Sequence, residues 1–244
     1  HPFNQSLNRM KNVIQTLSDA LAKRGYDTLT PVQTAVSDPT IVDQDLLVSA
    51  QTGSGKTVGF GLAIAPNILG DSPKFGKADA PLALVIAPTR ELAMQVKREL
   101  AWLYGDAGAV MASCVGGMDM RDERRALSNG AHIVVATPGR LRDHIQRSSI
   151  DLSAIRAVVL DEADEMLDLG FREDRDAWCF RSDCLRHWHD SGSRCACHAD
   201  DGLVTRQSPP NQCRWPAGAR RVRQGCDSSH HCSVGGQGGH WLRL

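Results

Sequence analysis

Apolar residues recur at helical intervals in four segments of the chain. Over residues 7–24 they lie three or four positions apart, and Gly25 follows as a helix-stop signal. Similar runs cover residues 56–69, 91–104 and 140–146. These four segments are therefore predicted to be helices.

Short apolar runs, typical of strands, separate the predicted helices. They cover residues 46–49, 82–87, 110–115, 132–136 and 155–160. The run LALVIA at 82–87 shows no polar alternation, as in a parallel strand covered on both faces. Strands that alternate with helices predict an α/β fold with a doubly wound parallel sheet. Ligands of such sheets bind beyond the carboxyl ends of the strands, where the polar clusters of this sequence also fall.

Overall composition excludes several classes of protein. The 244 residues include 28 basic and 28 acidic side chains, so the chain is not a globally basic nucleic-acid binder, although a local basic surface remains open. No apolar stretch is long enough to span a membrane, so we expect no membrane partner. The N-terminus lacks the basic and apolar regions of a secretory signal. These features predict a cytoplasmic protein.

The composition changes sharply near Phe171. Residues 1–171 hold 17 Lys and Arg, 20 Asp and Glu and one cysteine. Residues 172–244 hold 7 cysteines and 11 Arg but no Lys, Ile, Tyr or Met, and only eight of them are Val, Leu or Phe. So little apolar material does not offset the conformational entropy of folding. We therefore predict a domain over 1–171 and a separate, low-apolar tail over 172–244.

Three interpretations of the tail compete. A metal module would use its cysteines and histidines, but structural zinc needs paired C-x₂₋₄-C spacing and the tail has C-x-C and single cysteines, so no structural zinc is expected. Natural disorder favours Lys, Glu and Ser over Trp and Cys. The dominant residues have GC-rich codons, which suggests translation out of frame from about residue 175. The tail is predicted to be disordered or out of frame.

A phosphate-binding loop is predicted at residues 50–57, between a strand and a helix. Its sequence AQTGSGKT meets the pattern G-x-x-x-x-G-K-[ST] except at its first position. Glycines let main-chain N–H groups close around phosphate oxygens, and the helix N-terminus adds a favourable partial charge. An ordinary Gly/Ser turn is the alternative. The predicted nucleotide-binding residues of the loop are Ala50, Gln51, Thr52, Gly53, Ser54, Gly55, Lys56 and Thr57.

An acidic cluster ends the last predicted strand. Asp161 and Glu162 follow the apolar run VVL directly. Beside a phosphate loop, Asp161 and the Thr57 hydroxyl are candidate Mg²⁺ ligands, Lys56 a candidate phosphate contact, and Glu162 a candidate base for the attacking water. An acidic first helical turn is the alternative, but it does not account for two carboxylates at the strand end.

The set of motifs resembles the DEAD-box ATP-dependent RNA helicases, named after the sequence Asp-Glu-Ala-Asp at 161–164. Matching segments occur in the family's order, from the Q motif through motifs I, Ia, GG and Ib to motif II, at residues 25–33, 50–57, 88–92, 116–117, 137–140 and 161–164. The resemblance covers residues 3–171. It implies a RecA-like P-loop NTPase domain that is incomplete at its C-terminal end, with ATP and Mg²⁺ as cofactors and RNA as partner.

The resemblance also implies residue roles. Gln33 would hydrogen-bond the adenine edge, and Tyr26 or Phe3 would stack on it. Motifs Ia, GG and Ib would contact the sugar–phosphate backbone of RNA, with low sequence specificity. The residues implied in RNA binding are Pro88, Thr89, Arg90, Gly116, Gly117, Thr137, Pro138, Gly139 and Arg140.

The sequence departs from the family pattern after Asp164. It lacks the Ser-Ala-Thr segment that links hydrolysis to strand separation, the second RecA-like domain with its arginine fingers, and at least one expected core strand. Three hypotheses for function remain open. The chain is the ATP-binding half of a helicase, inactive alone; or a non-enzymatic fragment that binds nucleotide or RNA; or an unrelated P-loop ATPase, which the ordered motifs disfavour.

Overall fold

A computed structural model of the protein describes residues 13–51, 53–168, 220–223 and 239–243. Phe3 and Thr52, which the sequence assigns to the adenine and phosphate sites, lie outside these residues. All seven cysteines of the tail also lie outside them, so the expectation about zinc stays a prediction. No helix within the described part is long and apolar enough to cross a membrane.

Five parallel strands form the body of the sheet, as predicted. The strands are β1 Leu46–Ser49, β2 Ala83–Ile86, β3 Met111–Cys114, β4 Ile133–Ala136, β5 Ala157–Leu160, β6 Arg220–Arg223 and β7 Gly239–Arg243. Their spatial order is β3-β4-β2-β5-β7-β1-β6. The chain crosses over between non-neighbouring strands through helices, which is the doubly wound topology.

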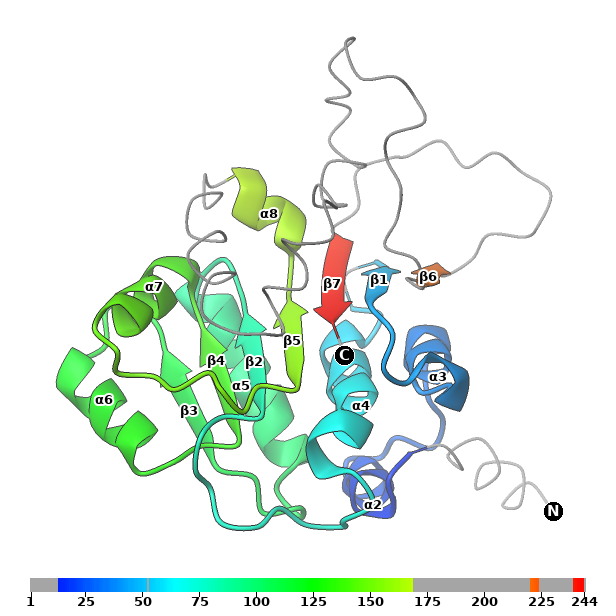
Figure 1. The fold of residues 1–244 in the computed structure, drawn as a ribbon. Coiled ribbons are helices and arrows are strands. Elements are labelled where there is room, and N and C mark those ends of the chain that lie inside the picture. Colours follow the sequence, from blue (N-terminus) through cyan, green and yellow to red (C-terminus); the bar gives the residue numbers. More distant parts are fainter. Residues whose placement is uncertain (1–12, 52, 169–219, 224–238, 244) are drawn as a thin grey trace, which may run out of the picture.

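Helices pack on both faces of this sheet (Figure 1). They are α2 Gln15–Lys23, α3 Pro31–Val36, α4 Lys56–Leu69, α5 Arg90–Leu103, α6 Met120–Ser128, α7 Pro138–Gln146 and α8 Ala163–Asp168, with a short 3-10 helix at Pro39–Ile41. The predicted helices over 56–69, 91–104 and 140–146 are present, and the one over 7–24 corresponds, within the described residues, to α2, which begins only at Gln15. Helices α3, α6 and α8 were not predicted, because α3 and α8 are short and α6 has mostly polar residues.

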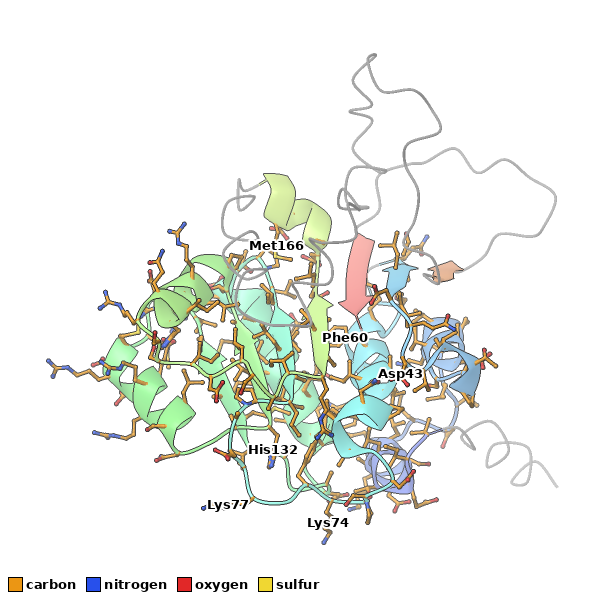
Figure 2. The ribbon with its side chains drawn as sticks, in the orientation of Figure 1. Asp43, Phe60, Lys74, Lys77, His132 and Met166 are labelled. Atoms are coloured by element: carbon orange, nitrogen blue, oxygen red, sulfur yellow. The ribbon has the colours of Figure 1, made fainter. Side chains whose placement is uncertain are left out.

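Alternate residues of strands β1–β5 enter two separate cores. Val85 packs with α4 and α5, whereas its neighbour Leu84 packs with α7 and α8. Figure 2 labels one residue of each core, Phe60 on α4 and Met166 on α8. Because successive side chains of a strand point to opposite faces, a strand buried on both faces must be apolar throughout. This explains the unbroken apolar run at residues 82–87.

Two strands of the sheet come from the compositionally distinct tail, to which the sequence assigned none. Strand β6 pairs parallel with β1, and β7 lies between β1 and β5, antiparallel to both. Strand pairing uses main-chain groups that every residue except proline carries, so a segment without apolar periodicity can fill this position. The division of the chain at residue 171 stays a prediction.

Candidate functional site

Strand register brings the predicted motifs to one edge of the sheet. Ile86, the last residue of β2, aligns with Ala136 of β4 and Leu160 of β5. Asp161 N–H then donates to the Ile86 carbonyl oxygen at 2.8 Å. The segments that follow β1, β2, β3, β4 and β5 therefore leave the sheet at the same edge, its carboxyl end (Figure 1).

The phosphate loop joins β1 to α4, as the sequence predicts. Gly53 and Gly55 have φ of 80° and 81°, a left-handed conformation that favours glycine. Gly55 is the N-cap of α4, so the loop ends at a helix N-terminus. The Ser54 hydroxyl oxygen is buried and has no hydrogen-bond partner among the described residues. A buried, unpaired donor beside helix N–H groups fits a phosphate oxygen.

Lys56 folds back over the loop that precedes it. Its Nζ donates to the Ala50 carbonyl oxygen at 2.7 Å, and the side chain is half-buried. This contact ties the ammonium group to the first residue of the loop. The role of Lys56 as a cation for phosphate stays a prediction.

The segment that resembles the Q motif is bonded directly to the phosphate loop. The Thr30 hydroxyl donates to the Ser54 carbonyl oxygen at 2.9 Å, and Gln33 Nε2 donates to the Gly55 carbonyl oxygen at 3.1 Å. Thr30 and Gln33 also form a capping box that begins α3. Gln33 therefore couples α3 to the loop.

Gln33 is fully buried in this arrangement, and its amide oxygen accepts from Thr30 N–H. Both polar atoms of its side chain thus have main-chain partners, although each retains capacity for one more bond. Tyr26 stacks on Trp102 of α5, with ring centroids 5.9 Å apart. The roles of Gln33 and Tyr26 toward adenine stay predictions.

The acidic strand end lies close to Lys56. Asp161 is buried directly after β5, and Glu162 follows with φ of 51°. A left-handed conformation at a non-glycine residue costs about 1–3 kcal/mol and is concentrated at functional sites. Burial, a hydrogen bond with Glu165 and the negative charge of Asp161 raise the pKa of Glu162 to about 7, whereas the positive charge of Lys56 opposes this rise. The phosphate loop and the acidic cluster thus form one site.

The three segments implied in RNA binding meet around the loop that follows β3. Arg90, at the start of α5, donates from Nη1 to the Gly116 carbonyl oxygen at 3.1 Å. Arg140, from α7, donates from Nη2 to the Met118 carbonyl oxygen at 3.0 Å. Gly117 has φ of 77°, and a Cβ there would collide with the Arg90 guanidinium group. The structure therefore brings motifs Ia, GG and Ib together on one surface.

Thr137 and Pro138 connect this surface to α7. The Thr137 side chain does not cap the helix, but its hydroxyl accepts from Gly116 N–H at 3.4 Å. Pro138 occupies the first helical turn, where a missing N–H costs nothing. A Cβ at Gly139 would meet no atom within 4 Å, so the main chain there is open to a ligand. Pro88 is buried, Thr89 caps α5, and Arg90 is exposed.

Sequence reasoning missed two buried polar residues beneath this surface, Glu123 of α6 and His144 of α7. The Glu123 carboxylate accepts from Val115 N–H at 2.8 Å and lies 2.9 Å from His144 Nε2 and 3.6 Å from Arg140 Nη1. Neither residue belongs to a motif. No apolar pattern in the sequence could have revealed Glu123, because the residue that α6 buries is itself charged.

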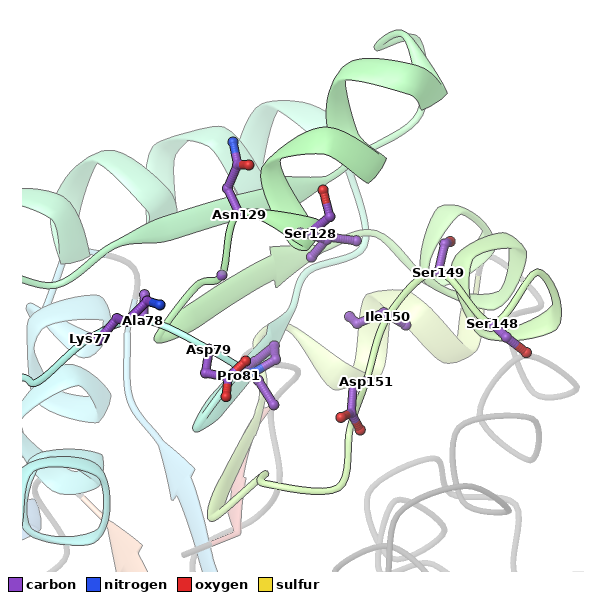
Figure 3. A pocket seen from close by; sticks show the side chains of 13 residues that line it. Lys77, Ala78, Asp79, Pro81, Ser128, Asn129, Ser148, Ser149, Ile150 and Asp151 are labelled. Atoms are coloured by element: carbon purple, nitrogen blue, oxygen red, sulfur yellow. The ribbon is translucent and has the colours of Figure 1, made fainter.

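An open pocket of about 540 Å³ lies at the opposite edge of the sheet. Figure 3 shows Lys77, Asp79, Asn129 and Asp151 around it, from segments that precede β2, β4 and β5. None of the predicted motif residues lines this pocket. Volume alone would therefore misplace the site, whereas the strand ends and the unpaired Ser54 hydroxyl indicate the carboxyl edge.

Comparison with curated proteins finds many related helicases. The chain is 45% identical over 157 residues to DEAD-box ATP-dependent RNA helicase 53 of Oryza sativa subsp. japonica, which covers 64% of this chain and 25% of that protein. It is 41% identical over 163 residues to DEAD-box ATP-dependent RNA helicase CshA of Bacillus subtilis, which covers 67% of this chain and 32% of the relative. The chain thus spans about a quarter to a third of these relatives.

Solved structures agree with these relatives. The yeast DEAD-box splicing factor Prp28 superposes with a TM-score of 0.63 at 30% identity, over 70% of this chain and 41% of the other. A DEAD box protein from Methanococcus jannaschii gives 0.63 at 33% identity, over 71% and 46%. The family profile described as DEAD/DEAH box helicase matches residues 30–182, more than half of the sequence. Together with the P-loop and acidic strand end at one sheet edge, this match shows that the chain belongs to the DEAD/DEAH box helicase family.

Proposed function

We propose that this chain supplies the ATP-binding and RNA-contacting half of an ATP-dependent RNA helicase. One observation carries the proposal. The positive charge of Lys56, on the phosphate loop, acts on Glu162. The surface that carries Arg90 and Arg140 lies at the same edge of the sheet. ATP and RNA would therefore bind on neighbouring surfaces of one rigid sheet, which suits a protein that couples the two.

ATP would bind with its phosphates on the loop. Main-chain N–H groups near Gly53 and Gly55, the Ser54 hydroxyl and the Lys56 ammonium group offer donors and positive charge to phosphate oxygens. Gln33 is attached to the end of this loop, so a base in contact with Gln33 would lie next to the phosphates. Preference for adenine over guanine rests on the donor and acceptor of this amide.

The residues fit a magnesium ion held jointly with nucleotide. Mg²⁺ is usually bound by one or two carboxylates together with substrate phosphates and waters. Asp161 is a buried carboxylate at the strand end, and Thr57 lies in the first turn of α4 beside the loop. When bound, the ion would neutralise charge on the phosphates. No cluster of three or more acidic, His or Cys ligands occurs in the described residues, so the fit is to an ion shared with nucleotide rather than to a protein cage.

Glu162 would act on the attacking water. A general base works best when its pKa lies near the working pH, and burial brings the pKa of Glu162 to about 7. The negative charge of Asp161 raises the pKa of this carboxyl group, and the positive charge of Lys56 lowers it. Its role is to orient the water and to accept its proton.

RNA would bind through its sugar–phosphate backbone. Arg90 and Arg140 supply positive charge, and Gly139 permits close approach of the main chain. Gly117 leaves room for the Arg90 guanidinium group. Both arginines are anchored on carbonyl oxygens of the same loop, so their guanidinium groups are held in place before RNA arrives. Such contacts position a strand without reading its bases.

We further propose that these 244 residues hydrolyse ATP negligibly by themselves and unwind no duplex. The sequence after Asp164 contains no Ser-Ala-Thr segment and no motif that would carry an arginine finger. Arginine fingers contribute about 10³–10⁵ in rate to phosphoryl transfer. The alternative is a non-enzymatic fragment that binds nucleotide or RNA.

The test is an ATPase assay with and without single-stranded RNA, in which Glu162→Gln serves as the blank. We expect the wild-type rate to equal the blank, while ATP and RNA each bind measurably in separate titrations. Turnover that exceeds the blank and rises with RNA would contradict the proposed inactivity. Failure to bind ATP would contradict the assignment of the site itself.

A further inference from the structure

The loop that carries the proposed RNA contacts is held almost entirely by side chains of other elements. It runs from Val115 to Asp119, and its residues from Gly116 onward are exposed. Gly116 is bonded through its carbonyl oxygen to Arg90 and through its N–H to Thr137, and the Met118 carbonyl oxygen accepts from Arg140. The arrangement of this loop therefore depends on the residues beneath it.

Glu123 is the buried centre of that support. Its side chain is only 2% exposed, and Oε1 accepts from Val115 N–H at 2.8 Å, at the first residue of the loop. Oε2 lies 2.9 Å from His144 Nε2 and 3.6 Å from Arg140 Nη1. The same carboxylate thus contacts the loop directly and, through Arg140, contacts it a second time at Met118.

His144 completes the network on the inner side. Its ring is fully buried, and because an ionised carboxylate only accepts, Nε2 must carry the proton that points at Glu123. The other ring nitrogen, Nδ1, lies 2.8 Å from the Ser149 hydroxyl. The imidazole is therefore fixed at both ends, and it fixes the orientation of the carboxylate in turn.

A buried negative charge next to an RNA surface needs a reason, because by charge alone it repels phosphate. Burying a carboxylate is costly unless it is paired and hydrogen-bonded, and Glu123 has three such partners. Those partners belong to the loop, to the proposed RNA-contacting Arg140 and to α7. The contacts of Glu123 are thus directed at the RNA surface rather than at the two apolar cores.

We propose that Glu123, oriented by His144, is a positioning residue that fixes the Val115–Asp119 loop and the Arg140 guanidinium group in their RNA-contacting arrangement. The inference rests on the proposed RNA-binding function of this surface. It adds two residues that lie in none of the motifs. It predicts that removal of this acidic side chain weakens RNA binding, which is opposite in sign to the effect of charge alone.

The first arm of the test measures affinity of the full chain for a fluorescent single-stranded RNA and for ATP. The variants are Glu123→Ala and Glu123→Gln. The matched control is Asp122→Asn, which removes an exposed carboxylate from the preceding position of α6. We expect Glu123→Ala to weaken RNA binding at least tenfold with ATP affinity unchanged. Asp122→Asn should leave RNA affinity equal or slightly tighter.

Glu123→Gln should weaken RNA binding less than Glu123→Ala does, because it keeps an acceptor for Val115 N–H but loses the negative charge that faces Arg140. Its amide oxygen can accept from Val115 N–H, and its amide nitrogen can donate to His144 Nε2 once the ring proton moves to Nδ1, where the Ser149 oxygen accepts it. If Gln and Ala variants lose RNA binding equally, or if Glu123→Ala binds RNA as well as wild type, the inference is wrong.

The second arm reads the loop without RNA. Hydrogen exchange of the Val115 and Gly116 amides should accelerate at least tenfold in Glu123→Ala, while the amides of β2 and β4 keep their protection. Equal acceleration in the strands would indicate a general loss of stability and would overturn the positioning role. Because this arm needs no RNA, it decides the inference even if the wild-type chain fails to bind RNA, a result that would refute only the proposed function.

Discussion

Single charged side chains decide the chemistry of the proposed nucleotide site, and Lys56 is the clearest. Its ammonium group lies 2.7 Å from the carbonyl oxygen of Ala50, the first residue of the phosphate loop. We expect Lys56→Ala to lower ATP affinity at least tenfold, or about 1.4 kcal/mol, because it removes the cation of the site. Calorimetric titration with ATP measures this. The control is Lys74→Ala, an exposed lysine in the segment that precedes β2, and equal affinities of the two variants would refute the assignment.

Glu162 gives a prediction about pH at the same scale. Its pKa is raised by burial from 4.5 to about 7, so between these values the folded protein binds more protons than the unfolded chain. Stability of the nucleotide-free protein should therefore fall as pH rises from 4.5 to about 7. Glu162→Gln should flatten this decline in thermal melts at several pH values. Glu91→Gln, in the exposed first turn of α5, controls for loss of charge, and identical profiles for the Glu162 variant and wild type would contradict the prediction.

At the scale of elements, close packing of α4 on α5 depends on one glycine. A Cβ at Gly61 would come within 2.7 Å of Leu103 Cδ2 and 2.9 Å of Leu100 Cδ2, both in the buried core. Helix propensity alone favours alanine by about 1 kcal/mol, but overpacking a core costs about 1–3 kcal/mol. We expect Gly61→Ala to be destabilising in urea unfolding.

The same helix provides the matched control. A Cβ at Gly59, half a turn away, would meet its nearest atom at 3.6 Å, an ordinary contact. Gly59→Ala should therefore be neutral or stabilising by up to about 1 kcal/mol. If both variants shift the urea midpoint in the same direction, the helix–helix contact does not control the effect.

At the scale of the whole molecule, β7 joins β1 to the rest of the sheet. It lies between β1 and β5, and Trp241 aligns with Leu47 on one side and with Leu160 on the other. Trp241→Pro removes a main-chain donor from this central strand, and an unpaired buried partner costs about 1–3 kcal/mol. We expect it to lower the free energy of unfolding by at least about 1 kcal/mol more than Trp241→Ala, which keeps the donor. Equal values would mean that β7 adds no main-chain pairing.

The sequence alone determined the local features of this protein. Apolar runs on strands β1–β5 and glycines at the phosphate loop are visible because burial on both faces and left-handed turns each restrict which residues can occur. The helicase motifs come directly after these strands in the sequence, at the strand ends where a parallel sheet binds its ligands. Family and fold class were therefore predictable from residues close together in the chain.

Only the tertiary structure decided contacts between distant residues. The Glu123–His144 pair joins two helices through polar groups that follow no periodicity, and β7 joins the sheet through main-chain atoms that every sequence shares. Gln33 likewise is bonded to a loop 22 positions away. Such contacts depend on where the folded chain brings its polar groups together, because hydrogen bonds act over short distances in space and leave no regular spacing in sequence.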